Sequence, residues 1–176
     1  MTNKPNVLLV FLIVAALLGA FAYFIQVYYF DTQHGMAQID YAINVSDDRE
    51  LVGFSSDVFI GKVIEQTGSS NEPNLQTHFS VEIIESIKGN STGNVTVKQF
   101  GGYEHVFIWR SLTLADGDEL LRPGEIYLFV TKGDDERGYT FAPTYGNLLI
   151  EDQEDYEQKK LRFQKAYAEE IPFEFP

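Results

Sequence analysis

The sequence predicts a mainly β fold, in which short strands close into a small barrel with a short helix before it and an amphipathic helix after it. Two observations predict the barrel. Apolar residues recur at every second position in several short segments after residue 56, and turn-forming residues separate these segments. A third observation, an apolar run near the N-terminus, predicts one transmembrane helix ahead of the barrel. We therefore expect a membrane segment over 1–30, a linker over 31–45 and a folded domain over 46–176.

The composition fits one folded domain and excludes several classes of protein. The chain has 176 residues, a size usual for a single domain. Its 26 acidic and 13 basic side chains give a formal net charge of −13, which would repel the phosphates of a nucleic acid, so no nucleic-acid partner is expected. Because the chain has no cysteine, disulfide bonds, thiolate metal ligands and a cysteine nucleophile are excluded.

The apolar run from Val7 to Phe30 is long enough to cross a bilayer. As a helix its 24 residues would reach roughly 36 Å, compared with a hydrocarbon core of about 30 Å. Aromatic residues gather at its C-terminal end, as in the interfacial belts of membrane proteins. Lys4 precedes the run and no basic residue closely follows it, so the positive-inside rule puts the N-terminus in the cytoplasm and residues 31–176 outside. Membrane lipid is thus the expected partner of residues 7–30.

A cleavable signal peptide is the alternative interpretation of this run. Ala20-Phe21-Ala22 has the small-x-small form of a cleavage site. The apolar run continues for eight residues beyond Ala22 and only one Lys precedes it, which favours an uncleaved signal anchor. An exported domain without disulfides is typical of Gram-positive bacteria, so we expect a single-pass protein of the cell membrane of such a bacterium.

Several short strands make up most of the predicted domain. The expected strands are 57–64, 78–87, 95–98, 106–114, 126–131, 139–142 and 148–150. A stretch rich in Gly, Ser, Asn and Pro, from Thr67 to Gln76, predicts an exposed loop between the first two strands. Because each strand has one apolar face, the strands must curl on themselves or pair with a second sheet to bury those faces.

Two helices are expected at the borders of the strands. Asp47 and Glu50 have the spacing of a capping box, which predicts a short helix just before the first strand. The stretch 152–170 predicts a longer helix, with acidic residues in its first turns and basic residues after them. An apolar face of this helix is formed by Tyr156, Phe163 and Tyr167.

The order of these elements resembles the superfamily of netrin modules and tissue inhibitors of metalloproteinases. The resemblance covers roughly residues 46–168, and its pieces are Ser56-Asp57-Val58-Phe59-Ile60-Gly61-Lys62-Val63, Phe79-Ser80-Val81-Glu82-Ile83-Ile84, Ile87-Lys88-Gly89, Gly124-Glu125-Ile126-Tyr127-Leu128-Phe129-Val130 and Gln158-Lys159-Lys160-Leu161 with Tyr167. It implies an OB-type barrel flanked by helices, which recognises proteins through its loops. By this resemblance the Thr67–Gln76 loop could reach a partner, and the alternative is an ordinary surface hairpin loop.

The chain differs from this superfamily at the segment with which the animal members inhibit proteases. In the animal inhibitors a Cys-x-Cys N-terminus with a free amine chelates the zinc of the protease. Here there is no cysteine, and the corresponding segment, near Tyr41 to Val45, lies inside the chain beyond the apolar run. The resemblance therefore transfers no functional residue, and modulation of a protease remains a minor alternative.

No group of residues has the spacing of a catalytic or metal site. His34, His78 and His105 lie far apart in the sequence, and none belongs to a metal-binding motif. The acidic turns Asp116–Glu119 and Asp134–Glu136 offer oxygen ligands for Ca²⁺ but lack EF-hand spacing, so we expect solvated turns. We expect no cofactor, no metal ion and no enzymatic activity.

The most distinctive stretch is Gly101–Arg110, which contains the only Trp of the chain. If it forms one strand, its aromatic residues share a face with a histidine, and an outward face of this kind anchors a protein or stacks on a sugar. The alternative is that Phe107 and Trp109 belong to the core. With two polar residues of the predicted loop, the candidate binding residues are Tyr103, His105, Phe107, Trp109, Asn71 and Asn74.

Together these observations predict a membrane-anchored, extracytoplasmic binding module without catalytic activity. Its expected partner is another extracellular or membrane protein, recognised through the barrel loops. The alternative is a module that binds the cell envelope or a polysaccharide through the aromatic face.

Overall fold

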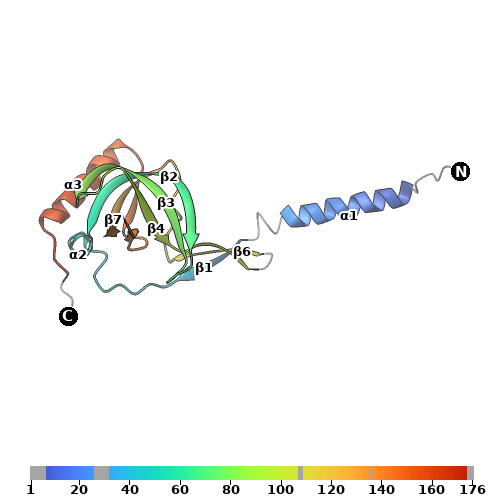
Figure 1. Ribbon diagram of the computed structural model, residues 1–176, viewed down its shortest axis with the longest axis horizontal. Helices are drawn as coiled ribbons and strands as arrows, with labels where there is room; N and C mark the ends of the chain where they lie inside the picture. Colours follow the sequence, from blue (N-terminus) through green and yellow to red (C-terminus); the bar gives the residue numbers. More distant parts are fainter. Residues whose placement is uncertain (1–6, 26–31, 107–108, 135, 174–176) are drawn as a thin grey trace. The chain divides into compact units, whose positions relative to one another are not determined.

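The computed structural model describes residues 7–25, 32–106, 109–134 and 136–173 (Figure 1). Contacts between residues divide the chain into two compact units. The first unit consists of residues 1–35 and 103–112, and the second of residues 36–102 and 113–176. The second unit therefore contains nearly all of the predicted domain.

The apolar helix of the first unit is α1 (Val7–Ile25). Its 19 residues reach about 28 Å, close to the thickness of a hydrocarbon core, and the side chains from Leu8 onward are all exposed. The helix is long and apolar enough to cross a membrane, a test that a signal sequence also passes. The predicted apolar helix is confirmed over the described part of the run, and residues 26–30 lie outside the described residues.

A three-stranded sheet has the order β1-β6-β5, with β1 at Thr32–Ala37, β5 at Gly102–Val106 and β6 at Trp109–Ala115. The linker predicted over 31–45 thus contains a strand, which its sequence does not indicate because β1 lacks the alternation of apolar and polar residues. The strand predicted over 106–114 corresponds to β6, but its predicted start is wrong, because β6 begins at Trp109 and Val106 ends the neighbouring strand β5.

The second sheet has the order β2-β3-β4-β8-β7-β9, and β2 also pairs with β7. Five strands therefore form a ring, β2-β3-β4-β8-β7, and the expected mainly β fold is confirmed (Figure 1). All of these pairs are antiparallel except β4–β8, which is parallel. The strands are β2 (Asp57–Ser70), β3 (Gln76–Lys88), β4 (Asn94–Phe100), β7 (Ile126–Asp134), β8 (Gly138–Phe141) and β9 (Asn147–Ile150).

The β2–β3 hairpin is longer than the sequence predicts. Pairing continues outward to Ser70 opposite Gln76, so the loop comprises residues 71–75 and not 67–76. Four irregularities of register interrupt the hairpin. The outer part of β2, residues 65–70, is polar and mostly exposed, so residue types alone predict a loop there, whereas Thr77 and Phe79 of the paired strand β3 are buried.

Two apolar cores share the strands of the ring. Alternate residues of a strand point to opposite faces, so Phe59 and Phe129 join a core enclosed by the ring, while Val58 and Leu128 join a second core. The second core lies between the outer face of the sheet and the helices α2 (Asp48–Phe54) and α3 (Gln153–Ala168). Phe163 of α3 is fully buried there.

The capping residues of both helices are those that the sequence predicts, but one predicted hydrogen bond has a different donor. Asp152 accepts a hydrogen bond from the backbone N–H of Asp155, 2.9 Å, and so begins α3 where predicted. Asp47 caps α2, but the carboxylate of Glu50 accepts a hydrogen bond from the backbone N–H of Asn44, 3.1 Å, and not from that of Asp47. The helix is confirmed, whereas the reciprocal bond of the expected capping box is absent between these described residues.

Candidate functional site

A groove of about 340 Å³ lies in the second unit, between residues 38–46, which we call the wall segment, and the strands β7 and β8. The wall segment belongs to no helix or strand, and it bends at residues 42–43 and turns at residues 45–46. The lining of the groove is mainly apolar and includes Ile43, Val45, Leu51, Val130 and Ala142. This volume lies at the small end of the range of ligand pockets, enough for one or two side chains of a bound peptide. The groove is thus a candidate binding site.

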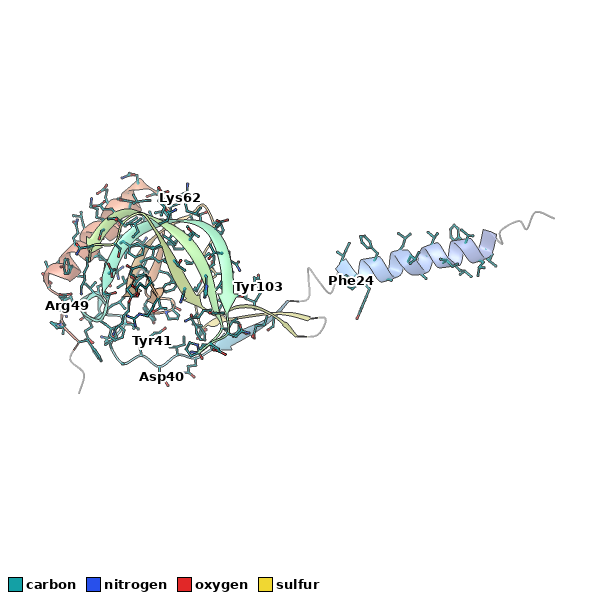
Figure 2. All side chains as sticks on the ribbon, in the orientation of Figure 1. Phe24, Asp40, Tyr41, Arg49, Lys62 and Tyr103 are labelled. Atoms are coloured by element: carbon teal, nitrogen blue, oxygen red, sulfur yellow. The ribbon has the colours of Figure 1, made fainter. Side chains whose placement is uncertain are left out.

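Side chains of the wall segment alternate between the protein and solvent. Ile39, Tyr41, Ile43 and Val45 are half-buried, whereas the residues between them are exposed. This is the side-chain pattern of a strand packed on one face. Figure 2 shows Tyr41 and Asp40 on this segment. The segment forms one wall of the groove with residues 40–43 and Val45.

Tyr41 fixes the segment against the loop after β8. Its hydroxyl donates a hydrogen bond to the carbonyl of Pro143, 2.9 Å, and its ring meets the ring of Tyr145 edge-on, with centroids 5.9 Å apart. Burial raises the pKa of Tyr41, and the nearby Asp118 and Tyr145 raise it further. The phenol therefore stays protonated and remains a hydrogen-bond donor.

The first part of this segment has unpaired backbone groups. Within the described part of the chain, no hydrogen bond is formed by the backbone N–H or C=O groups from Gln38 to Ile43, whereas Asn44 and Ser46 do form backbone hydrogen bonds. A segment with free backbone groups at the surface can pair with a strand from another chain. The groove beside it would receive side chains of that strand.

The end of the groove near Phe54 is fixed by ring contacts. The ammonium group of Lys132 lies 3.8 Å from the centroid of the Phe54 ring, and Phe173 meets the same ring edge-on at 5.1 Å. A cation over an aromatic face is an attractive contact. The rotamer of Phe54 is therefore set before any ligand binds.

One acidic turn forms a clamp between two strands. The Asp118 carboxylate accepts hydrogen bonds from the Gln99 side chain of β4 and the Asn147 side chain of β9, both at 3.0 Å. Gln99 is fully buried, and its carbonyl oxygen accepts a hydrogen bond from the backbone N–H of Leu121, 2.9 Å. Asp118 is therefore a structural residue, in contrast to the solvated turn expected from the sequence. Searched over the described ranges, the chain contains no group of three or more His, Cys, Asp or Glu side chains that could hold a metal ion.

The candidate binding residues from the sequence belong to both units. Asn71 and Asn74 are exposed in the β2–β3 loop of the second unit. Tyr103, in β5 of the first unit, is 36% exposed. Strands β5 and β6 contain His105 and Trp109, but their side chains, and Phe107 altogether, lie outside the described residues. Since Tyr103 and Trp109 belong to different strands, they do not form the one-strand face that was expected.

The described histidine side chain pairs with a serine. His78 Nε2 lies 2.9 Å from the Ser70 hydroxyl across the β2–β3 hairpin. Burial lowers the pKa of His78, and Lys98 lowers it further. Among the described side chains no carboxylate is hydrogen-bonded to this imidazole, so the pair lacks the third group of a catalytic triad.

Comparison with known proteins does not identify a family. No protein-family model matches the chain, and no curated protein matches it significantly. The function is therefore inferred from the groove, the wall segment beside it and the exposed loop.

Proposed function

We propose that this chain is a membrane-anchored extracytoplasmic module that binds another protein and does not catalyse a reaction. The observation that carries the proposal is the apolar groove beside the unpaired backbone of residues 38–43. A partner segment in extended conformation would pair with this backbone and place apolar side chains in the groove. Main-chain hydrogen bonds would supply affinity, and the groove would select the side chains.

The ring of strands supports a finer description of the fold as an OB-type barrel related to netrin modules. Five strands, one parallel pair and closure by β2–β7 fit a five-stranded, partly open barrel of that type. Folds of this kind bind through their loops, so the exposed β2–β3 loop with Asn71 and Asn74 is a second contact for the partner. This part of the proposal rests on analogy between folds.

The apolar helix supports the membrane anchor. The described part of α1 has the length and composition of a spanning helix, and Lys4 before it favours a cytoplasmic N-terminus. The partner would accordingly be an extracellular protein or the outer part of a membrane protein. Retention of the helix, in place of cleavage after Ala22, belongs to the proposal.

The test compares two Thr→Trp variants of the full chain in lipid nanodiscs. Thr140 lines the groove, so Thr140→Trp fills it, while Thr92 is exposed in the β3–β4 loop and away from the groove lining. Each protein serves as bait for the solubilised membrane and envelope proteins of its native cell, with captured proteins identified by mass spectrometry. Circular dichroism checks that both variants are folded.

We expect a protein that the wild-type chain and Thr92→Trp capture equally, and whose recovery falls about tenfold with Thr140→Trp, the loss expected when a central contact is blocked. Equal recovery with both variants would refute the groove as the binding site. Retention of the bait on wall polysaccharide, without an enriched protein, would replace protein binding by envelope binding.

A further inference from the structure

We infer that the groove binds an extended segment of another protein in which a basic residue stands two positions from an apolar residue, with the basic side chain paired to Asp40. This inference rests on the proposed function and adds the chemistry of the partner. It follows from the carboxylate at the edge of the groove, the contacts of the basic side chains of this chain and the geometry of an extended segment.

Asp40 brings an unpaired negative charge to the groove. It is the one acidic residue among the described residues that line the groove, and its side chain is exposed on the wall segment (Figure 2). Within the described part of the chain its carboxylate forms no hydrogen bond and no ion pair. A cation from outside can therefore bind this carboxylate without displacing a partner within the chain.

A second carboxylate acts on the same end of the groove. Burial raises the pKa of Tyr41, and the charge of Asp118 raises it further, so Asp118 lies near the residue that follows Asp40. The Asp118 carboxylate already accepts hydrogen bonds from Gln99 and Asn147. The two charges make this end of the groove negative, and of the two carboxylates that of Asp40 is the one open to a new partner.

The basic side chains of this chain leave Asp40 to a partner. Among the described residues, seven Lys or Arg side chains form an ion pair with a carboxylate of the same chain. The basic residue that lines the groove, Lys132, lies with its ammonium group 3.8 Å from the centroid of the Phe54 ring. All 26 acidic residues of the chain lie beyond residue 30, together with all but one of the 13 basic residues. A basic segment is therefore attracted to this domain, and an acidic segment is repelled.

The spacing of two positions follows from the geometry of an extended segment. Its residues rise about 3.3 Å each, so residues two positions apart point to the same side, about 7 Å from one another. When an apolar side chain enters the groove, the residue two positions away faces the edge of the groove. There the stem of a Lys or Arg lies along apolar surface, while its charged end reaches the carboxylate.

Labelled heptapeptides test the pairing with the full chain in nanodiscs of neutral phosphatidylcholine. Thr-Lys-Thr-Leu-Thr-Gln-Thr and its reverse, Thr-Gln-Thr-Leu-Thr-Lys-Thr, present the basic residue on either side of the apolar one, which covers both directions of a bound strand. In the neutral and acidic counterparts, Gln or Glu replaces the Lys. Binding is measured by fluorescence anisotropy, with empty nanodiscs as the blank.

We expect one of the two Lys peptides to bind the wild-type chain about threefold to fivefold more tightly than its neutral counterpart at low salt, the gain from one ion pair. High salt should remove most of this preference. Asp40→Asn should abolish the preference, while Glu65→Gln, which removes an equal charge from an exposed residue of β2 outside the groove lining, should keep it. Asp40→Lys should reverse the preference, so that the acidic counterpart binds more tightly than the Lys peptide. A groove that is merely damaged would not produce this reversal.

The outcomes separate this inference from the proposed function. A Lys peptide that binds no more tightly than its neutral counterpart, or a preference that Asp40→Asn leaves unchanged, would overturn the role of Asp40 and leave the groove as a binding site. Binding in the groove also requires that Thr140→Trp weaken all of these peptides. If none of the peptides binds the wild-type chain, or if Thr140→Trp leaves their binding unchanged, the inference and the groove both fail.

Discussion

Replacing Asp118 by Ala removes the acceptor of the clamp between β4 and β9. The carboxylate accepts hydrogen bonds from the fully buried Gln99 and from the half-buried Asn147. A hydrogen bond to a charged group contributes about 1.5–3 kcal/mol, and water can replace only the more exposed of the two. We therefore expect Asp118→Ala to lower the free energy of unfolding by about 2–4 kcal/mol. Asp116→Ala, in the same turn, removes an exposed side chain without a described side-chain bond, and we expect a change of less than about 0.5 kcal/mol.

The measurement is urea unfolding of the full chain in detergent micelles, followed by pulse proteolysis. Both variants lose one carboxylate, so they share the same change in net charge and differ only in the hydrogen bonds lost. A thermal scan of each variant gives a second, independent order of stability. If the two unfold at the same urea concentration, Asp118 is a solvated residue and the clamp does not stabilise the sheet.

Three further outcomes are expected from the described contacts. Two hydrogen bonds of 2.7 Å each join the hydroxyl of Ser91 to Tyr139 and to the buried Asp57. We expect Tyr139→Phe and Ser91→Ala each to lower the free energy of unfolding by about 1–2 kcal/mol, and the double variant to lose less than the sum of the two. Additive losses in this double-mutant cycle would refute the coupling of the two hydrogen bonds. The hydrogen bond from Lys160 of α3 is the main cause that lowers the pKa of Glu85, so the contribution of Glu85 to stability is complete above the ordinary carboxyl pKa and is lost as the pH falls through the lowered pKa. We therefore expect the free energy of unfolding of Glu85→Gln to depend less on pH in that range than that of the wild-type chain. An unchanged pH profile in acid unfolding would contradict this. A Cβ at Gly53 would lie 1.9 Å from the carbonyl oxygen of Ile171, so Gly53→Ala should detach the C-terminal segment and speed its removal by carboxypeptidase, while equal rates would show that the segment is already free.

Local patterns in the sequence predict the elements whose residues alone determine them. The start of α3 follows from Asp152, because a capping side chain acts on the next turn of its own helix. The core strands follow from alternation, which sorts Phe59 into one core and Val58 into the other. Such features need no knowledge of a distant partner.

The features missed by sequence reasoning depend on distant partners. Thr32–Ala37 is a strand because β6 pairs with it, and its own residue types do not favour that conformation. Gly101 has a φ of 87°, and a Cβ there would lie 2.1 Å from the carbonyl oxygen of Thr113, so only glycine allows the chain to turn into β5 at this point.

The sequence gives only weak evidence of the groove, in the residue pattern of one of its walls. One wall, residues 38–46, largely alternates apolar and polar residues as a strand does, but it lies outside the row of predicted strands, so the sequence predicts a linker there. The other wall is about a hundred positions later, as the bond from Tyr41 to Pro143 shows with a separation of 102 residues. No periodicity within one segment predicts such a contact.

The closing pair of the ring sets an order of events during synthesis. β2 pairs with β3 soon after both are made, but its second neighbour, β7, begins at Ile126. Until β7 emerges from the ribosome, the nascent sheet has two open edges, β2 and β4, and its future core faces water. Translation proceeds at about 5–20 residues per second, so this interval lasts several seconds, far longer than a hairpin needs to form. The ring is therefore completed only after β8, residues 138–141, has been made, and a chain that stops before β7 exposes two strand edges on which aggregation can begin.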